Sequence, residues 1–407
     1  MGPFSMVELV RFRNEWIGIC GDLVLVVNDR GARMHIATHN GIYELPSQRI
    51  TIGSTVFDPS TWFEPGPLAN FSIYSDVDDA AKYVTRVLGD RLRGKRIGIS
   101  FSGGKDSVTL AAVLKKVCEH VGCELYAIYI HMPFIEPVRY VKEVERIAKA
   151  VGVELTYGEP PRKIVAKYLI REGLPYRRAR WCTYLKTRRL RQVAFNELKC
   201  NYVAIGDRIW ENLKRFSRLS RLVLQEKLSS KKAIYPIAPA TLCDTIGIAR
   251  SLNALHVAYV EGCLRVSCLM CPYKSVIELS RYSIDNELED PGFIHWILKR
   301  EWRKWYADKG IAYEDFVGEA LWRFVPKVAK MFLEVKKVSS NESETKYTHD
   351  EVRDGIAKFM INPGCCQRLG LEAVETVARV LSEGARPLYI NVLELVKSVS
   401  RFSPRGC

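Results

Sequence analysis

The chain has 407 residues, of which 47% are hydrophobic and 26% are charged. This composition excludes a disordered or membrane protein and is typical of a globular chain with about two or three domains. The formal net charge of +15 attracts polyanions, either nucleic acids or phosphorylated small molecules, although basic surfaces also occur in proteins that bind neither. No membrane-spanning apolar run is present, and the first residues do not resemble a signal peptide. We therefore expect a cytoplasmic protein without a membrane partner.

The N-terminal part is expected to form a small β-rich domain over residues 1–75. Short runs of β-branched residues at 23–27 and 49–52 alternate with turn-forming residues. A connector rich in Pro, Gly and Ser follows, and a helix is predicted from Asp76 to Leu92.

From Lys95 the pattern changes to apolar strands that alternate with amphipathic helices. Strands are predicted at 96–102, 124–132, 153–156 and 202–205, with helices at 106–120 and 138–152. This alternation predicts an α/β fold with a doubly wound parallel sheet, and we place this domain at residues 76–284. In such a sheet the ligand lies outside the carboxyl ends of the strands.

Residues 285–407 are predicted to be a helical C-terminal region, with a polar linker near 336–350. Beyond the linker, helical periodicity continues through 374–385 and 388–400.

The segment from Ser102 to Ser107, SGGKDS, is a glycine-rich turn between an apolar strand and an amphipathic helix. Gly103 and Gly104 let backbone N–H groups approach an anion, and the start of the helix adds partial positive charge. Lys105 and the two serine hydroxyls complete a phosphate cradle. The segment lacks the GxxxxGK spacing of the Walker loop, which disfavours an ordinary P-loop NTPase. A chance glycine-rich turn is the alternative.

This segment resembles the SGGKDS signature of the PP-loop (adenine nucleotide alpha hydrolase-like) superfamily. The resemblance implies a HUP-like fold and an enzyme that cleaves ATP between its α and β phosphates to adenylate a substrate. It also implies catalytic roles for Lys105 and Asp106, with Asp106 as a candidate ligand of Mg²⁺.

Three later segments resemble elements of the phosphoadenylyl-sulfate (PAPS) reductase family. Residues 180–186, RWCTYLK, resemble its RxCxxxK element, and 235–244 resemble its YPI…T..D element. Residues 206–215 resemble G-x-R-x-x-E-S-x-x-R, with Asn212 in place of serine. The resemblance covers about residues 95–275.

The resemblance implies that these segments add nucleotide-binding residues to the loop: Gly206, Glu211 and the cations Arg180, Lys186, Arg208 and Arg215. The four cations are suited to the anionic groups of a sulfonucleotide or a triphosphate, although each is also compatible with a surface salt bridge. Glu211 is a candidate to orient an arginine or to help bind Mg²⁺. His131 to Pro133 depart from the Asp-Thr-Gly of many relatives, and His131 is as compatible with packing as with ligand binding.

Twelve cysteines in a reducing compartment favour metal binding or thiol chemistry over disulfides, with hyperthermophile proteins as the exception. Cys20, Cys118, Cys123 and Cys200 are expected to be small core residues.

The strongest cysteine pattern is Cys263-x4-Cys268-x2-Cys271-Pro272, because CxxC presents two thiolates to one metal centre. Zn²⁺ and an iron–sulfur cluster both fit. Residues 265–272 also resemble an R-x-G-C-x-x-C-P segment of archaeal and DNA-sulfur-modifying relatives of PAPS reductase, with Ser267 in place of glycine.

In those relatives the cysteine of the RxC element joins the later cysteines around a four-iron cluster. The resemblance implies Cys182, Cys268 and Cys271 as ligands, with Cys263 as a less certain fourth. Three ligands would leave one iron open to bind sulfur. A redox dithiol or plain buried thiols are the alternatives. Cys365 and Cys366 are compatible with ligand, redox or structural roles.

Three functions fit the sequence. The first is a sulfonucleotide reductase in which a thiolate, from Cys182 or a C-terminal cysteine, attacks sulfur and an AMP-type nucleotide leaves. The second is an ATP-dependent sulfurtransferase acting on a tRNA or DNA base. The basic charge and the aromatics between Trp296 and Lys304 are compatible with RNA docking, although such aromatics also build helix cores. The third is a nucleotide-binding interaction module without turnover. A thiol or electron-donor protein is a further candidate partner.

Overall fold

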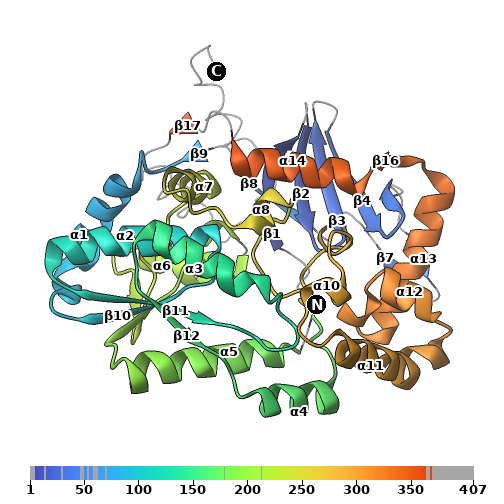
Figure 1. The fold of residues 1–407 in the computed structure, drawn as a ribbon. Coiled ribbons are helices and arrows are strands. Elements are labelled where there is room, and N and C mark those ends of the chain that lie inside the picture. Colours follow the sequence, from blue (N-terminus) through green and yellow to red (C-terminus); the bar gives the residue numbers. More distant parts are fainter. Residues whose placement is uncertain are drawn as a thin grey trace.

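The computed structural model describes residues 5–12, 15–28, 31–45, 50–52, 55–57, 63–68, 71–177, 179–211, 213–363 and 367–368. Two sheets dominate this part of the chain, and Figure 1 shows them with the helices that cover them. No helix among the described residues has the length and apolar character needed to span a membrane.

The central sheet has the strand order β12-β11-β10-β13-β15-β14. Every neighbouring pair is parallel except β14 and β15. The order reverses between β10 and β13, so this is the doubly wound α/β architecture that the sequence predicts. Its strands are β10 (Arg96–Ser100), β11 (Glu124–Ile130), β12 (Leu155–Gly158), β13 (Tyr202–Ala204), β14 (Ser229–Ser230) and β15 (Ala233–Ile234).

Helices cover both faces of this sheet (Figure 1). Alternate residues of a strand point to opposite faces, so Ala127 and Tyr129 of β11 join the main core while Ile128 and Ile130 join a smaller cluster on the other face. The helices of this part are α1 (Val77–Leu92), α2 (Lys105–Val121), α3 (Arg139–Val151), α4 (Arg162–Glu172), α5 (Trp181–Arg191), α6 (Leu213–Leu224) and α7 (Leu242–Ser251). The predicted helix from Asp76 is confirmed, and the Asp76 side chain caps it by accepting from Asp79 N.

The second sheet is built mainly from the N-terminal part, as predicted. Its order is β16-β5-β4-β3-β2-β1-β8. The strands are β1 (Ser5–Phe12), β2 (Glu15–Cys20), β3 (Leu23–Asn28), β4 (Gly31–Thr38), β5 (Gly41–Glu44), β8 (Phe63–Leu68) and β16 (Thr345–Tyr347). Two short pairs lie outside it: β6 (Ile50–Ile52) with β7 (Thr55–Phe57), and β9 (Phe71–Ser72) with β17 (Gln367–Arg368).

The predicted polar linker near 336–350 is wrong, because these residues form regular structure. Helix α13 (Pro326–Glu342) continues into it, and β16 pairs with β5. Buried Tyr347 anchors the strand, and Thr348 caps the next helix in a capping box with Glu351. A polar composition alone did not reveal these anchors.

Helices α8 (Val257–Val260), α9 (Val276–Leu279) and α10 (Ile284–Glu287) lead from the central domain into the C-terminal region. Apart from β16 and β17, the described part of that region is mainly helical: besides α13 it contains α11 (Pro291–Glu301), α12 (Tyr313–Gly318) and α14 (His349–Ile361). The predicted helices at 374–385 and 388–400, together with Cys365 and Cys366, lie outside the described residues.

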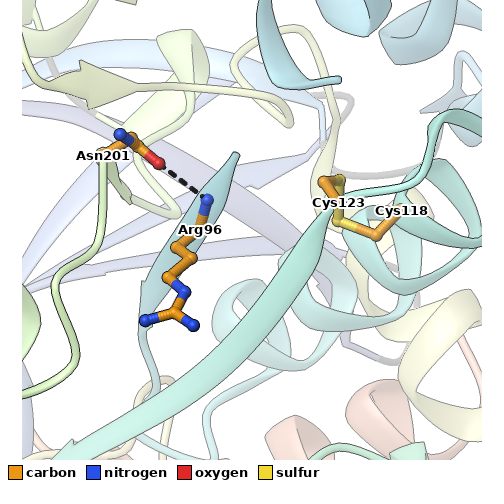
Figure 2. The surroundings of a disulfide bond; sticks show 4 residues. All are labelled: Arg96, Cys118, Cys123 and Asn201. Carbon is orange, nitrogen blue, oxygen red and sulfur yellow. Dashed lines mark hydrogen bonds between the residues drawn. A yellow bond between two sulfur atoms is a disulfide. The ribbon is translucent and has the colours of Figure 1, made fainter. Parts of the chain in front are cut away.

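The interpretation of Cys118 and Cys123 as plain core thiols is wrong, because they form a disulfide. Helix α2 ends at Val121 and is capped by Gly122, whose left-handed φ of 73° turns the chain back; the Cα atoms of the two cysteines lie 4.4 Å apart. Figure 2 shows the disulfide together with Arg96, whose backbone N donates to Asn201 Oδ1. Cys200 is buried as predicted, whereas the side chain of Cys20 lies outside the described part.

Candidate functional site

The glycine-rich loop follows β10 at the carboxyl edge of the central sheet, where a ligand is expected. Its two serines support the turn: Ser102 N donates to Ser107 Oγ at 3.1 Å, and Ser107 Oγ donates to Gly104 O at 2.9 Å. Gly103 has a φ of 72°, a conformation that favours glycine. A Cβ there would also lie 3.0 Å from Val144 Cγ2, so both conformation and space select glycine.

Asp106 lies at the start of α2 and is held by two cations. Lys105 Nζ donates to its Oδ2 at 2.8 Å, and Arg208 Nε donates to its Oδ1 at 2.6 Å. Arg208 is fully buried, and Lys105 is nearly so. Burial by itself raises the pKa of Asp106, but Arg208 and Lys105 outweigh it and hold this pKa well below its usual range. The loop therefore carries a carboxylate flanked by two positive charges.

Gly206 and Arg208 pack against the start of α2. A Cβ on Gly206 would lie 3.3 Å from the backbone C and O of Asp106, so glycine permits the close approach. Arg208 N donates to Glu211 Oε2 at 3.0 Å, and Arg215 pairs with Glu211. Burial raises the pKa of Glu211 above its usual value, because the opposing effect of Arg208 is smaller. Two of the four cations predicted from family-like elements, Arg208 and Arg215, thus belong to this network, whereas Arg180 and Lys186 do not.

Lys186, by contrast, lies beside the cysteines. Its Nζ donates to Glu136 Oε2 at 2.9 Å, and it acts electrostatically on Cys268 and Cys182. Burial lowers the pKa of Lys186, but Glu136 outweighs this and raises it. Sequence reasoning missed Glu136, a buried carboxylate six residues beyond β11, because no motif marks it.

Arg180 is exposed just before α5, and its guanidinium lies 4.9 Å from the ring centre of Tyr273. Tyr273 follows Cys271-Pro272, so this contact joins the two cysteine-bearing segments. His131 is buried, with its Nδ1 3.5 Å from Tyr129 Oη and 3.9 Å from Glu136 Oε2. Burial lowers the pKa of His131, which favours the neutral ring.

Three of the four predicted cysteine ligands gather near one another. Cys182 is the second residue of α5, while Cys268 and Cys271 lie in the loop before α9. Cys271 acts electrostatically on Cys182, and both of them act on Cys268. Burial raises the pKa of Cys182 and of Cys268, whereas Lys186 lowers both. Within the described part of the chain, no three His, Cys, Asp or Glu side chains are arranged as a metal site.

Cys263 occupies a separate, fully buried environment. Its Sγ lies 3.0 Å from Tyr282 Oη and 3.8 Å from Lys274 Nζ. It packs with Tyr140 and Ala258, whereas Cys182 and Cys268 pack in another cluster. These surroundings do not favour Cys263 as the fourth ligand of the same centre.

The cysteine-bearing segment packs directly on the glycine-rich loop. Lys105 N donates to Tyr259 Oη at 3.0 Å. A Cβ on Gly104 would lie 3.6 Å from Val266 Cβ, which is two residues before Cys268. Sequence reasoning missed Tyr259, because nothing in the sequence links this tyrosine to the loop. The contacts make the loop and the cysteine segment neighbours.

Thr241 and Asp244, which resemble the T..D element, have structural roles. They form the capping box of α7, and Asp244 Oδ1 also accepts from the backbone N of Ile73 and Tyr74. They anchor the connector before α1 to the central domain. Asn212 of the neighbouring element lies outside the described residues.

Comparison with known proteins gives a family match for the central domain. Residues 96–274 match the family model described as the phosphoadenosine phosphosulfate reductase domain. An uncharacterized protein of Methanocaldococcus jannaschii is 26% identical over 255 residues, which is 61% of this chain. The match covers 56% of that relative, so the chain spans little more than half of its length.

Several solved structures share a more distant likeness. The U34-tRNA thiolase NcsA from Methanococcus maripaludis, solved with its 4Fe-4S cluster, is 17% identical with a TM-score of 0.34, over 63% of this chain and 78% of that chain. NAD+ synthetase from Burkholderia pseudomallei is 16% identical with a TM-score of 0.30, over 57% and 93%. NMN synthetase from Francisella tularensis is 11% identical with a TM-score of 0.33, over 56% and 95%. Scores this low support no argument about function.

Proposed function

We propose that this chain, whose residues 96–274 belong to the phosphoadenosine phosphosulfate reductase family, is an ATP-dependent sulfurtransferase. It binds ATP at the glycine-rich loop, adenylates an acceptor oxygen and replaces that oxygen with sulfur at the neighbouring cysteines. The carrying observation is the contact between the two sites, through Tyr259 on Lys105 and Val266 on Gly104. An activated acceptor can therefore meet the thiols without leaving the protein.

In the first step, an oxygen of the acceptor attacks the α-phosphorus of ATP, the bond to the β-phosphate breaks, and pyrophosphate leaves. We propose that Lys105 and Arg208, which both contact Asp106 of the loop, offset the negative charge that develops on the phosphates. Asp106 is the candidate carboxylate for Mg²⁺, since hard oxygen donors suit that ion. The complete SGGKDS segment, with its cation pair, supports a triphosphate as the substrate.

In the second step, sulfur at the oxidation level of sulfide attacks the activated carbon, and AMP leaves with the original oxygen. No electrons are gained or lost overall, because a C=O group becomes C=S and sulfide is the sulfur source. Lys186 stabilises thiolate forms of Cys182 and Cys268.

The donor set of Cys182, Cys268 and Cys271 has the soft sulfur chemistry that suits iron or zinc. We propose that metal binding draws these three thiolates together. A four-iron cluster held by three cysteines would supply an open iron at which sulfide can bind. Zn²⁺ is the alternative occupant.

An anaerobic preparation incubated with ATP, sulfide and candidate acceptors tests the proposal. We expect AMP, pyrophosphate and the thiolated product to form in equal amounts. If iron is bound, we also expect visible charge-transfer absorption. ATP cleavage without sulfur incorporation into any acceptor would contradict sulfur transfer. If neither ATP nor a sulfonucleotide is consumed although both bind, the chain is instead a nucleotide-binding interaction module.

The family match supports a second candidate, reduction of a sulfonucleotide. A thiolate such as Cys182 would attack the sulfur, displace the adenylyl nucleotide and form a cysteine S-sulfonate. A dithiol donor would then release sulfite and become a disulfide, which balances the two electrons. The same preparation distinguishes the candidates, because this reaction yields sulfite without consuming ATP.

A further inference from the structure

Helix α5 lies in a stretch of the chain that is strongly basic and contains no acid. Residues 173–196 contain no Asp or Glu. The same stretch contains the cations Arg177, Arg178, Arg180, Lys186, Arg188, Arg189 and Arg191. A solvated helix usually mixes both signs of charge, so this one-signed stretch is unusual.

The exposed residues of α5 lie on one side of the helix. Exposed positions recur at spacings of three and four, which is the period of a single helix face, whereas Trp181 and Leu185 are buried. We define the α5 face as Arg180, Thr183, Tyr184, Thr187, Arg188 and Arg191. Tyr184 is 55% exposed, so its ring is available for stacking. At 1.5 Å per residue the face is about 16 Å long, which suits an extended ligand better than one nucleotide.

Two arginines of the α5 face, Arg188 and Arg191, are not neutralised by carboxylates in the described part of the chain. Among the described residues, Arg188 and Arg191 have no carboxylate partner, in contrast to Arg189, which pairs with Glu197 at 2.6 Å. Cys182 and Lys186 lie one turn apart on an adjoining side of the helix, next to Glu136 and the other thiols. A ligand that covers the α5 face therefore reaches the cysteines at its Cys182 end.

We propose that the α5 face docks an unpaired loop of a folded RNA, and that a base of this loop is the sulfur acceptor. Arginines contact the phosphates, and Tyr184 stacks on a base. A base must leave its stack to reach an enzymatic group, and an RNA loop already presents unstacked bases, whereas duplex DNA must be opened at a cost of a few kcal/mol. The identity of the acceptor rests on the proposed function, but the docking itself does not.

Binding of a fluorescently labelled RNA stem–loop tests the docking, measured by anisotropy at about 50 and 200 mM salt. We compare the wild-type chain with the double variant Arg188→Gln/Arg191→Gln and with Tyr184→Ala. The control is Arg221→Gln/Arg250→Gln, which removes two exposed arginines from α6 and α7. Thermal unfolding of each variant checks that it remains folded.

The double variant should bind about tenfold more weakly. The slope of log K against log salt should become less steep by about two, because each lost phosphate contact reduces the slope by about one. Tyr184→Ala should weaken binding with an unchanged salt slope, and the control should match the wild type. Equal losses in the control, or duplex DNA bound as tightly as the stem–loop, would overturn the docking proposal. RNA bound as expected but never thiolated, with ATP cleavage intact, would leave the docking standing and contradict sulfur transfer to RNA.

Discussion

The glycine-rich loop and the cysteine group lie side by side, yet they are built in different ways. The loop consists of six consecutive residues between β10 and α2, and its serines support one another. The cysteine group joins the start of α5 to a loop about ninety residues later, with Glu136 from a third segment. A site made from consecutive residues is visible as a motif, whereas an assembled site depends on the fold that brings its parts together.

The difference predicts that the two sites can be disabled separately. Lys105→Ala should slow ATP cleavage by about 100- to 1,000-fold, because a preorganised charge facing the developing phosphate charge is lost. Release of AMP at saturating ATP measures this effect. Lys95→Ala, which removes an exposed lysine next to β10, is the matched control. A cleavage rate within a few-fold of wild type would exclude a catalytic role for Lys105.

Cys182→Ser should impair sulfur transfer and leave ATP binding intact. Sulfur transfer should fall by at least about 100-fold, since even groups that only orient metal ligands are worth about 10- to 100-fold. Bound metal should fall as well, while ATP affinity stays within about twofold. Metal analysis, labelled sulfide and equilibrium nucleotide binding measure the three quantities. Cys200→Ser changes a buried cysteine in another cluster and should leave all of them unchanged.

Arg208→Gln tests a long-range partner of Asp106, the carboxylate of the loop. The change leaves Asp106 without its buried arginine and should lower the free energy of unfolding by about 3 kcal/mol. Urea unfolding measures the loss. Arg218→Gln removes an exposed arginine that pairs with Asp207, and should cost less than about 0.5 kcal/mol. Similar losses for both variants would mean that the Asp106 pair does not stabilise the fold.

A buried histidine, His256, lies where the two sites meet. Its ring lies against Gly103, and its Nδ1 caps α8 by accepting from Ala258 N. Burial lowers the pKa of His256 to about 4. Below about pH 6.5 the histidine is therefore protonated in the unfolded chain but not in the folded chain. The free energy of unfolding falls as the pH drops towards 4. His256→Asn keeps a capping acceptor and should reduce this slope by up to about 1.4 kcal/mol per pH unit.

Urea unfolding between pH 7 and 4 measures the slope. The variant should retain the share due to His35, whose pKa burial also lowers to about 4. An unchanged slope would show that His256 is not protonated differently in the two states.

The central α/β fold was readable from the sequence because buried parallel strands and amphipathic helices differ in period. The order of these elements along the chain then required a doubly wound sheet, and the loop at its carboxyl edge followed from the same logic. Local signals failed where an element depends on distant partners. Strand β16 has the sequence Thr-Lys-Tyr, which carries little strand signal, and it forms by pairing with β5. The Cys118–Cys123 disulfide depends on the turn at Gly122.

The sequence by itself determined the residues from Ser102 to Ser107 as an anion-binding turn, since glycine conformation and the start of a helix are local properties. It also predicted Cys182, Cys268 and Cys271 as ligands of one metal centre, and this role stays a prediction. Only the tertiary structure decided which groups meet: Arg208 with Asp106, Lys186 with Glu136 and the thiols, and Cys263 apart from them. The physical reason is that charge pairing and burial act over a few ångströms in space, whatever the separation along the chain.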